Sequence, residues 1–123
     1  MLDMVSVRRL WGLAEMQASY NREACGILRL DVESGLLNVL PLPNFAIHHY
    51  RAFLMALSVE QWRGCAATWH SHLKGRAIPS GRDIQAMDRT GFPMVIISLP
   101  ERMACLYRGN GRSYPCIEVH KIP

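Results

Sequence analysis

The chain has 123 residues, of which 50% are hydrophobic and 20% are charged, and its net charge at pH 7 is +4. This length fits one domain, so we assign residues 1–123 to a single unit. The basic residues are scattered along the chain, which argues against nucleic-acid binding. Apolar runs such as 93–99 are shorter than the ~20 residues of a membrane helix, and the N-terminus lacks the apolar region of a signal peptide. We therefore expect a cytoplasmic protein that contacts neither nucleic acid nor membrane.

The first part of the chain is predicted to form a helix followed by a hairpin. Apolar residues recur at three- and four-residue intervals between positions 4 and 20, which indicates an amphipathic helix. Residues 24–30 and 36–40 are short apolar runs on either side of a turn at Gly35, and they predict two strands. Pro41 is expected to end the second of them.

The middle of the chain contains a capping signal between two apolar runs. Residues 52–57 are interpreted as a further strand. Ser58 and Gln61 then have the Ser-x-x-Gln spacing of a capping box, which predicts a short helix that ends at Gly64. The apolar run 65–69 is predicted to be a buried strand.

The C-terminal part is predicted to contain a loop, a helix and three strands. Gly, Lys, Arg and Pro in residues 73–79 indicate the loop, and a helix over 80–90 follows. Residues 94–99 are rich in Val and Ile and favour a buried strand, and 103–107 with 114–120 suggest a final hairpin. The order of elements, with at least one crossover helix, indicates an α/β or α+β fold with a mixed β-sheet flanked by helices.

Two histidines at the end of a predicted strand form a candidate metal site. His70 and His72 are one residue apart, so their side chains project from the same face of the strand. Asp83 lies in the first turn of the following helix and can reach the same point across the loop. Two imidazoles and one carboxylate leave a fourth tetrahedral position open, as in catalytic rather than structural zinc sites.

The support for a metal site comes from the combination of these residues rather than from any one of them. Ser80 stands three residues before Asp83, a spacing typical of helix capping that implies no chemistry by itself. A close pair of histidines alone is also more often structural than metal-binding. The full pattern His-x-His-x7-Ser-x2-Asp should occur by chance on the order of once in several thousand chains of this length. Its occurrence here therefore favours a functional site.

The motifs resemble the signature of the JAMM (MPN+/JAB) metallopeptidases, which is a Glu upstream of His-Ser/Thr-His-x7-Ser-x2-Asp. The matching segments are Glu-Ala-Cys-Gly-Ile-Leu at 23–28, Trp-His-Ser-His at 69–72 and Pro-Ser-Gly-Arg-Asp at 79–83, with further similarity at Pro-Asn 43–44 and over 91–99. The chain is most similar to the stand-alone prokaryotic or phage type. The resemblance implies a cytidine-deaminase-like JAB/MPN domain.

The resemblance also implies a role for each motif residue. His70, His72 and Asp83 would hold Zn2+, which would lower the pKa of a bound water to roughly 7. Glu23 would take the proton of this water and deliver it to the leaving amine. Ser80 would donate a hydrogen bond to the oxyanion.

The implied function is a zinc-dependent peptidase or isopeptidase that cleaves next to the C-terminus of a ubiquitin-like or sulfur-carrier protein. Leu73 departs from the Pro found there in many members, and we expect a local change of the loop without loss of metal. Residues 44–58 leave little room for the insertions with which eukaryotic members grip ubiquitin. A non-catalytic JAB/MPN scaffold or binding module and a phage tail-assembly peptidase remain alternatives. The sequence does not indicate an oligomeric state.

Overall fold

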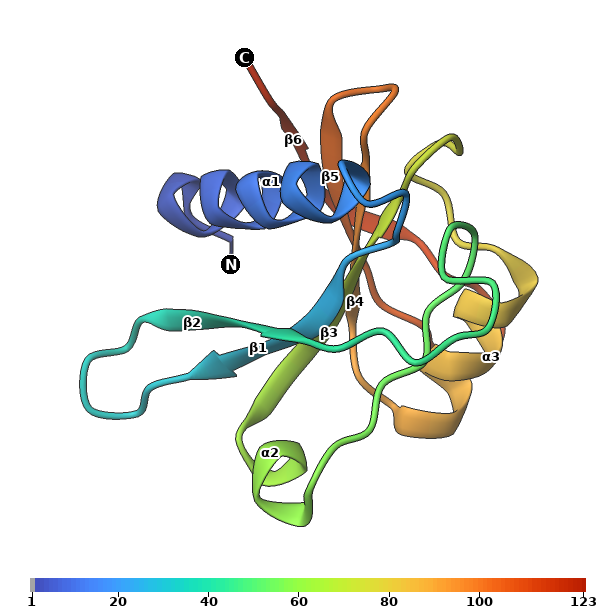
Figure 1. Cartoon of the computed structure of the whole chain (residues 1–123). Coiled ribbons are helices and arrows are strands. Elements are labelled where there is room, and N and C mark those ends of the chain that lie inside the picture. Colours follow the sequence, from blue (N-terminus) through green and yellow to red (C-terminus); the bar gives the residue numbers. More distant parts are fainter. Residues whose placement is uncertain (1) are drawn as a thin grey trace.

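The computed structural model describes residues 2–123, which form a six-stranded mixed sheet with helices on both faces (Figure 1). The helices are α1 (Met4–Ala18), α2 (Val59–Arg63) and α3 (Gly81–Thr90), and the strands are β1 (Cys25–Leu30), β2 (Leu37–Leu42), β3 (Cys65–His72), β4 (Met94–Ser98), β5 (Met103–Tyr107) and β6 (Cys116–Lys121). The strand order is β2-β1-β3-β4-β5-β6. The predicted fold class is confirmed. None of the helices within the described residues is long and apolar enough to cross a membrane.

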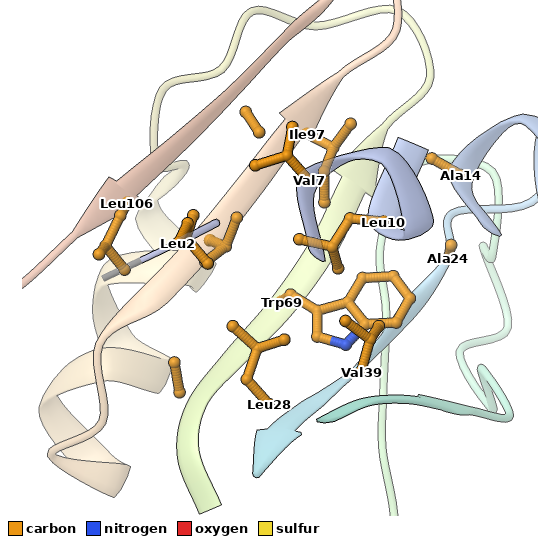
Figure 2. Close-up of a cluster of buried hydrophobic side chains, with 13 residues drawn as sticks. Leu2, Val7, Leu10, Ala14, Ala24, Leu28, Val39, Trp69, Ile97 and Leu106 are labelled. Atoms are coloured by element: carbon orange, nitrogen blue, oxygen red, sulfur yellow. The ribbon is translucent and has the colours of Figure 1, made fainter. Parts of the chain in front are cut away.

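Helix α1 covers one face of the sheet, as its apolar periodicity predicts. Asp3 caps its N-terminus, because the Asp3 side chain accepts a hydrogen bond from the backbone N–H of Ser6 at 2.7 Å. Val7, Leu10 and Ala14 are fully buried on its inner side. They pack with strand residues that include Trp69 (Figure 2). This layer forms the larger core and fixes the position of the central strands.

The hairpin of β1 and β2 is confirmed, but its second strand is longer than predicted. The strands pair antiparallel from Cys25 opposite Leu42 to Leu30 opposite Leu37. Strand β2 therefore continues through Pro41 instead of stopping there. Strand β2 lies at the edge of the sheet and has a neighbouring strand on one side only. Edge strands tolerate proline, because the missing N–H can be at a position that faces away from the neighbouring strand.

Gly26 allows Trp69 of the neighbouring strand to pack against the backbone of β1. The two residues are paired in the register of β1 and β3. A Cβ atom at position 26 would lie 2.8 Å from the Trp69 ring and 2.0 Å from the Leu40 carbonyl oxygen. Any larger residue would therefore displace the strand that precedes the candidate metal ligands.

The segment 52–57 is not a strand, so this prediction was wrong. It belongs to the irregular connection between β2 and α2, and its backbone is held by other contacts. The N–H of Leu54 donates to the Asn44 side chain at 3.1 Å, and the N–H of Phe45 donates to the Leu54 carbonyl at 2.9 Å. The capping box of Ser58 and Gln61 at the start of α2 is confirmed.

Helix α3 is the predicted crossover and lies on the face of the sheet opposite α1 (Figure 1). It connects β3 with β4, the parallel pair of the sheet, as such a pair requires. A second, smaller core lies on this side and includes Met87, Met94, Ile96 and Tyr107. The terminal hairpin of β5 and β6 is confirmed, although β6 begins at Cys116.

Candidate metal centre

The candidate ligands meet between the C-terminal end of β3 and the first turn of α3. The Nε2 atoms of His70 and His72 are 3.0 Å apart. The carboxylate of Asp83 lies 3.2 Å from each of them, through Oδ1 to His70 and through Oδ2 to His72. The alternation of a β-strand thus places both imidazoles on the α3 face, as predicted.

The donor set fits a zinc ion. Bonds of about 2.0–2.2 Å with tetrahedral angles would place neighbouring ligand atoms about 3.3–3.5 Å apart. The donor atoms of His70, His72 and Asp83 all lie within 4.8 Å of one another. Two imidazoles and one carboxylate are also the ligand chemistry that suits zinc. The three residues can therefore hold a metal ion after a small outward movement.

The surroundings orient the two imidazoles differently. Nδ1 of His72 is 2.7 Å from the Arg76 carbonyl oxygen, so it carries the proton and leaves Nε2 free to bind a metal. The ring of His70 stacks on Phe53 with a centroid distance of 4.2 Å. Nδ1 of His70 is buried and has no hydrogen-bond partner within residues 2–123. Packing, rather than a hydrogen bond to Nδ1, orients His70.

Two of the three candidate ligands are held in the protonation state that a metal site needs. Burial acts to raise the pKa of Asp83, but hydrogen bonds from His70 and His72 outweigh burial and hold this pKa well below its ordinary value. Burial lowers the pKa of His70. Burial also acts to lower the pKa of His72, yet its contacts with Asp83 and Arg76 raise it overall. An ionised carboxylate and a neutral His70 are therefore available, whereas a metal ion competes with a proton at His72.

Glu23 lies two residues before the start of β1 and faces the same cavity as His72 and Asp83. Only 5% of its surface is exposed, and burial raises the pKa of its carboxyl group to about 7. The nearby His72 opposes this rise and the nearby Asp83 adds to it. In the described chain the carboxylate has no hydrogen-bond or ion-pair partner. It is thus available to exchange a proton near neutral pH.

Ser71 ties the residue after Glu23 to the histidine strand. The N–H of Ala24 donates to Ser71 Oγ at 2.8 Å, and the N–H of Ser71 donates to the Ala24 carbonyl at 2.9 Å. Ser71 is fully buried. Because Ser71 stands between His70 and His72, these two hydrogen bonds fix the position of Glu23 relative to the candidate ligands.

Asn44 organises the wall of the cavity around Glu23. Its Nδ2 donates to the carbonyl oxygens of Glu23 at 3.1 Å and Ala52 at 2.9 Å. Its Oδ1 accepts from the N–H groups of Ala46 at 3.0 Å and Leu54 at 3.1 Å. One side chain therefore joins the start of β1 to the connection that carries Phe53.

Replacing Asn44 with aspartate is expected to destabilise the domain. The substitution keeps the shape but puts a carboxylate oxygen against carbonyl oxygens that now accept hydrogen bonds. We expect a loss of about 2 kcal/mol, or roughly 6–12 °C in Tm, measured by thermal unfolding. The control is Asn38→Asp on the exposed side of β2, which makes the same charge change without these contacts. Equal Tm values for both variants would contradict the role of Asn44.

Ser80 combines its capping role with an available hydroxyl proton. Its Oγ accepts a hydrogen bond from the N–H of Asp83 at 3.2 Å, and Asp83 Oδ2 accepts one from the N–H of Ser80 at 2.9 Å. This reciprocal pair is a complete capping box. Since the Oγ atom uses only a lone pair in it, its proton is free to be donated into the cavity that Ser80 lines.

The loop between β3 and α3 is anchored to the end of the sheet. Ser98 Oγ donates to the Gly75 carbonyl at 2.8 Å, and the N–H of Ala77 donates to Glu101 at 2.6 Å. The Tyr107 hydroxyl also donates to the Ala77 carbonyl. These hydrogen bonds hold the loop that leads to α3. The loop begins with Leu73, at the position where many family members have proline.

Four other ionisable residues differ in their position relative to the site. Arg76 turns away to pair with Glu101 at 3.5 Å, whereas Arg82 lines the cavity. His49 contributes only its carbonyl oxygen, which accepts from the N–H of Glu23 at 2.6 Å. His120 is remote from the site and contacts Glu118 at 2.9 Å.

A cavity of about 790 Å³ opens beside these residues. Four of the five predicted site residues line it, namely Glu23, His72, Ser80 and Asp83. His70 is the fifth, and it contacts His72 and Asp83 from the strand. The structure thus brings all five predicted residues together.

Three further residues of the site were missed by sequence reasoning. Asn44 was noted only as part of the segment 43–44 that resembles the family, and neither Ser71 nor Phe53 was assigned a role. Ser71 could have been found from its position between two candidate ligands. Asn44 has one short-range hydrogen bond, from the N–H of Ala46, but the contacts that place Asn44 and Phe53 at the site join segments distant in the chain.

The comparisons with known proteins identify a family. The family model described as prokaryotic homologs of the JAB domain matches residues 8–108. This span is more than half of the chain and contains all five predicted site residues. No curated protein shows significant similarity to the chain.

Proposed function

We propose that this chain, which belongs to the family of prokaryotic homologs of the JAB domain, acts as a zinc-dependent peptidase or isopeptidase. The observation that carries the proposal is the arrangement of the cluster beside an uncommitted carboxylate. His70, His72 and Asp83 can hold a metal ion, and Glu23 faces the same cavity without a partner in the described chain. A metal-binding scaffold would need the first three residues but not the fourth.

Each residue has a chemical role in the proposed reaction. Zinc held by His70, His72 and Asp83 would supply an acidified water and polarise the scissile carbonyl. Glu23 accepts a proton from the attacking water and returns it to the leaving amine, which its raised pKa allows. Ser80 donates its hydroxyl proton to the oxygen that becomes negatively charged.

Replacing Ser80 with alanine is expected to lower kcat by about two to three powers of ten, because an oxyanion donor is lost. The same change removes the cap of α3 and costs about 1 kcal/mol of stability. Ser58→Ala is the matched control, since Ser58 forms the same capping box at α2. Both variants should lose similar stability in thermal unfolding, and only Ser80→Ala should lose rate. A rate loss of equal size in both variants would assign Ser80 to capping alone.

The proposed substrates are proteins or peptides, with a bond next to the C-terminus of a ubiquitin-like or sulfur-carrier protein as the first candidate. The test incubates the zinc-loaded chain with such proteins carrying a C-terminal extension, and mass spectrometry detects release of the extension. Cleavage by the wild type but not by Glu23→Gln would support the proposal. Zinc binding without cleavage of any such fusion or of a mixed peptide library would instead indicate a non-catalytic scaffold.

A further inference from the structure

The cavity beside the candidate metal centre extends along α3, beyond the residues that the proposed chemistry uses. One face of the helix lines it through Arg82, Gln85, Ala86 and Arg89. These positions follow the three- and four-residue spacing of a single helix face. Arg82 and Arg89 are seven residues apart, which corresponds to about 10 Å along the helix axis. The cavity is therefore a groove that leads from Asp83 towards the C-terminal end of α3.

The groove carries unpaired positive charge. Its cationic lining residues are Arg51, Lys74, Arg82 and Arg89. Its acidic lining residues in the described chain are Glu23 and Asp83, which the proposed reaction already uses. Neither Arg82 nor Arg89 forms an ion pair within residues 2–123. Their natural complement is a carboxylate that comes from another molecule.

A second set of lining residues is apolar. The connection between β2 and α2 passes beside α3 before it reaches α2 (Figure 1). It contributes Phe53, Leu54, Met55 and Leu57 to the groove, and α2 adds Trp62. Leu54 is 59% exposed although it is a large apolar residue. This lining offers apolar contacts next to the row of arginines.

We propose that the groove binds an extended peptide with carboxylates that contact Arg82 and Arg89 and apolar side chains that contact residues 53–57. Successive side chains of an extended peptide point to opposite sides, so alternating acidic and apolar residues match the two linings. Side chains on the same side of such a peptide lie about 6.6 Å or 13 Å apart, and the long arginine side chains can bridge the difference from the about 10 Å between the two helix positions. The inference rests on the proposed function, because it specifies the substrate of that site.

Binding of short peptides tests this inference without requiring cleavage. The probe is a fluorescent octapeptide of alternating Asp and Leu with an amidated C-terminus, and the comparison peptide has Lys at each Asp position. Fluorescence anisotropy is measured with the full zinc-loaded chain carrying Glu23→Gln, so that no probe is consumed. We expect at least tenfold tighter binding of the Asp peptide at low ionic strength, and a smaller preference at high ionic strength because salt screens exposed charges.

Two arginines on helix ends provide a matched pair of variants. Arg89→Gln should weaken binding of the Asp peptide about three- to fivefold, the range of an exposed ion pair. Arg63→Gln should leave binding unchanged, because Arg63 lies in the last turn of α2 but outside the groove. The double variant Arg82→Glu with Arg89→Glu should reverse the preference towards the Lys peptide. A misfolded protein cannot produce such a reversal.

A third arm identifies the source of the carboxylate. Peptides with Gln in place of Asp are compared as free acid and as amide. Preference for the free acid would place the C-terminal carboxylate of the peptide at the arginines, and preference for the Asp amide would place side chains there. Equal binding of Asp and Lys peptides, or equal effects of Arg63→Gln and Arg89→Gln, would overturn the inference. If the wild type selects the Asp peptide but cleaves no substrate, the peptidase proposal fails and the binding groove stands.

Discussion

The variant Glu23→Gln is expected to keep its metal and to lose about three powers of ten in kcat. Glutamine preserves the shape of the side chain but cannot accept and return a proton. The metal ligands are unaffected, because the Glu23 side chain makes no hydrogen bond to them. Zinc content is measured by elemental analysis and turnover by mass spectrometry on a cleaved substrate. Glu15→Gln is the control, since this exposed residue of α1 makes the same charge change away from the site.

A second measurement on Glu23→Gln does not depend on a known substrate. Burial raises the pKa of Glu23 from 4.5 to about 7, so the folded chain binds a proton more tightly than the unfolded chain. The metal-free wild type should therefore lose stability as pH rises from about 4.5 to about 7, relative to the variant. Unfolding by denaturant at several pH values measures this difference. Parallel stability curves, or wild-type turnover in Glu23→Gln, would remove Glu23 from the proposed mechanism.

The three candidate ligands were predictable because local rules determine their positions. The two-residue period of a strand puts His70 and His72 on one face, and a capping box fixes Asp83 at the start of the next helix. Each rule acts within a few residues of chain. The loop between them follows no such short-range rule, but its hydrogen bonds to the end of the sheet hold α3 in place.

The rest of the site depends on contacts between distant segments. Glu23 reaches the cavity because Cys25 pairs with His70 in the register of β1 and β3, which composition and periodicity do not reveal. Resemblance to a family supplied this residue instead. Gly26 in the same motif has a physical explanation only once Trp69 is seen packed against it.

The wrong prediction for 52–57 has the same origin. Its apolar residues are typical of a strand, but β1 already has β2 and β3 as its two neighbours. The segment contacts Asn44 instead, and its side chains line the groove. An apolar run that gains neither a strand partner nor full burial is the feature that points to ligand contact here.

The variant Asp83→Asn is expected to abolish tight zinc binding while it preserves the fold of α3. The asparagine Oδ1 can still accept the hydrogen bond from the N–H of Ser80, so the capping box survives. The negative charge that neutralises the metal is lost, however. The loss of zinc affinity should exceed about 10- to 100-fold, which is the loss typical of altering the outer hydrogen bonds of a metal site. Competition with a chelator measures this affinity.

Thermal unfolding provides an independent measurement of the same loss. Zinc at about 100 times its Kd stabilises a folded protein by about 2.7 kcal/mol, and this gain should appear in the wild type and vanish in Asp83→Asn. Asp88→Asn is the matched control, because it makes the same charge change on the same helix, where Asp88 accepts a hydrogen bond from Tyr114. It should keep the zinc-dependent rise in Tm. If Asp83→Asn and Asp88→Asn respond to zinc equally, Asp83 is not a ligand, and the role of Glu23 as a base beside a metal falls with it.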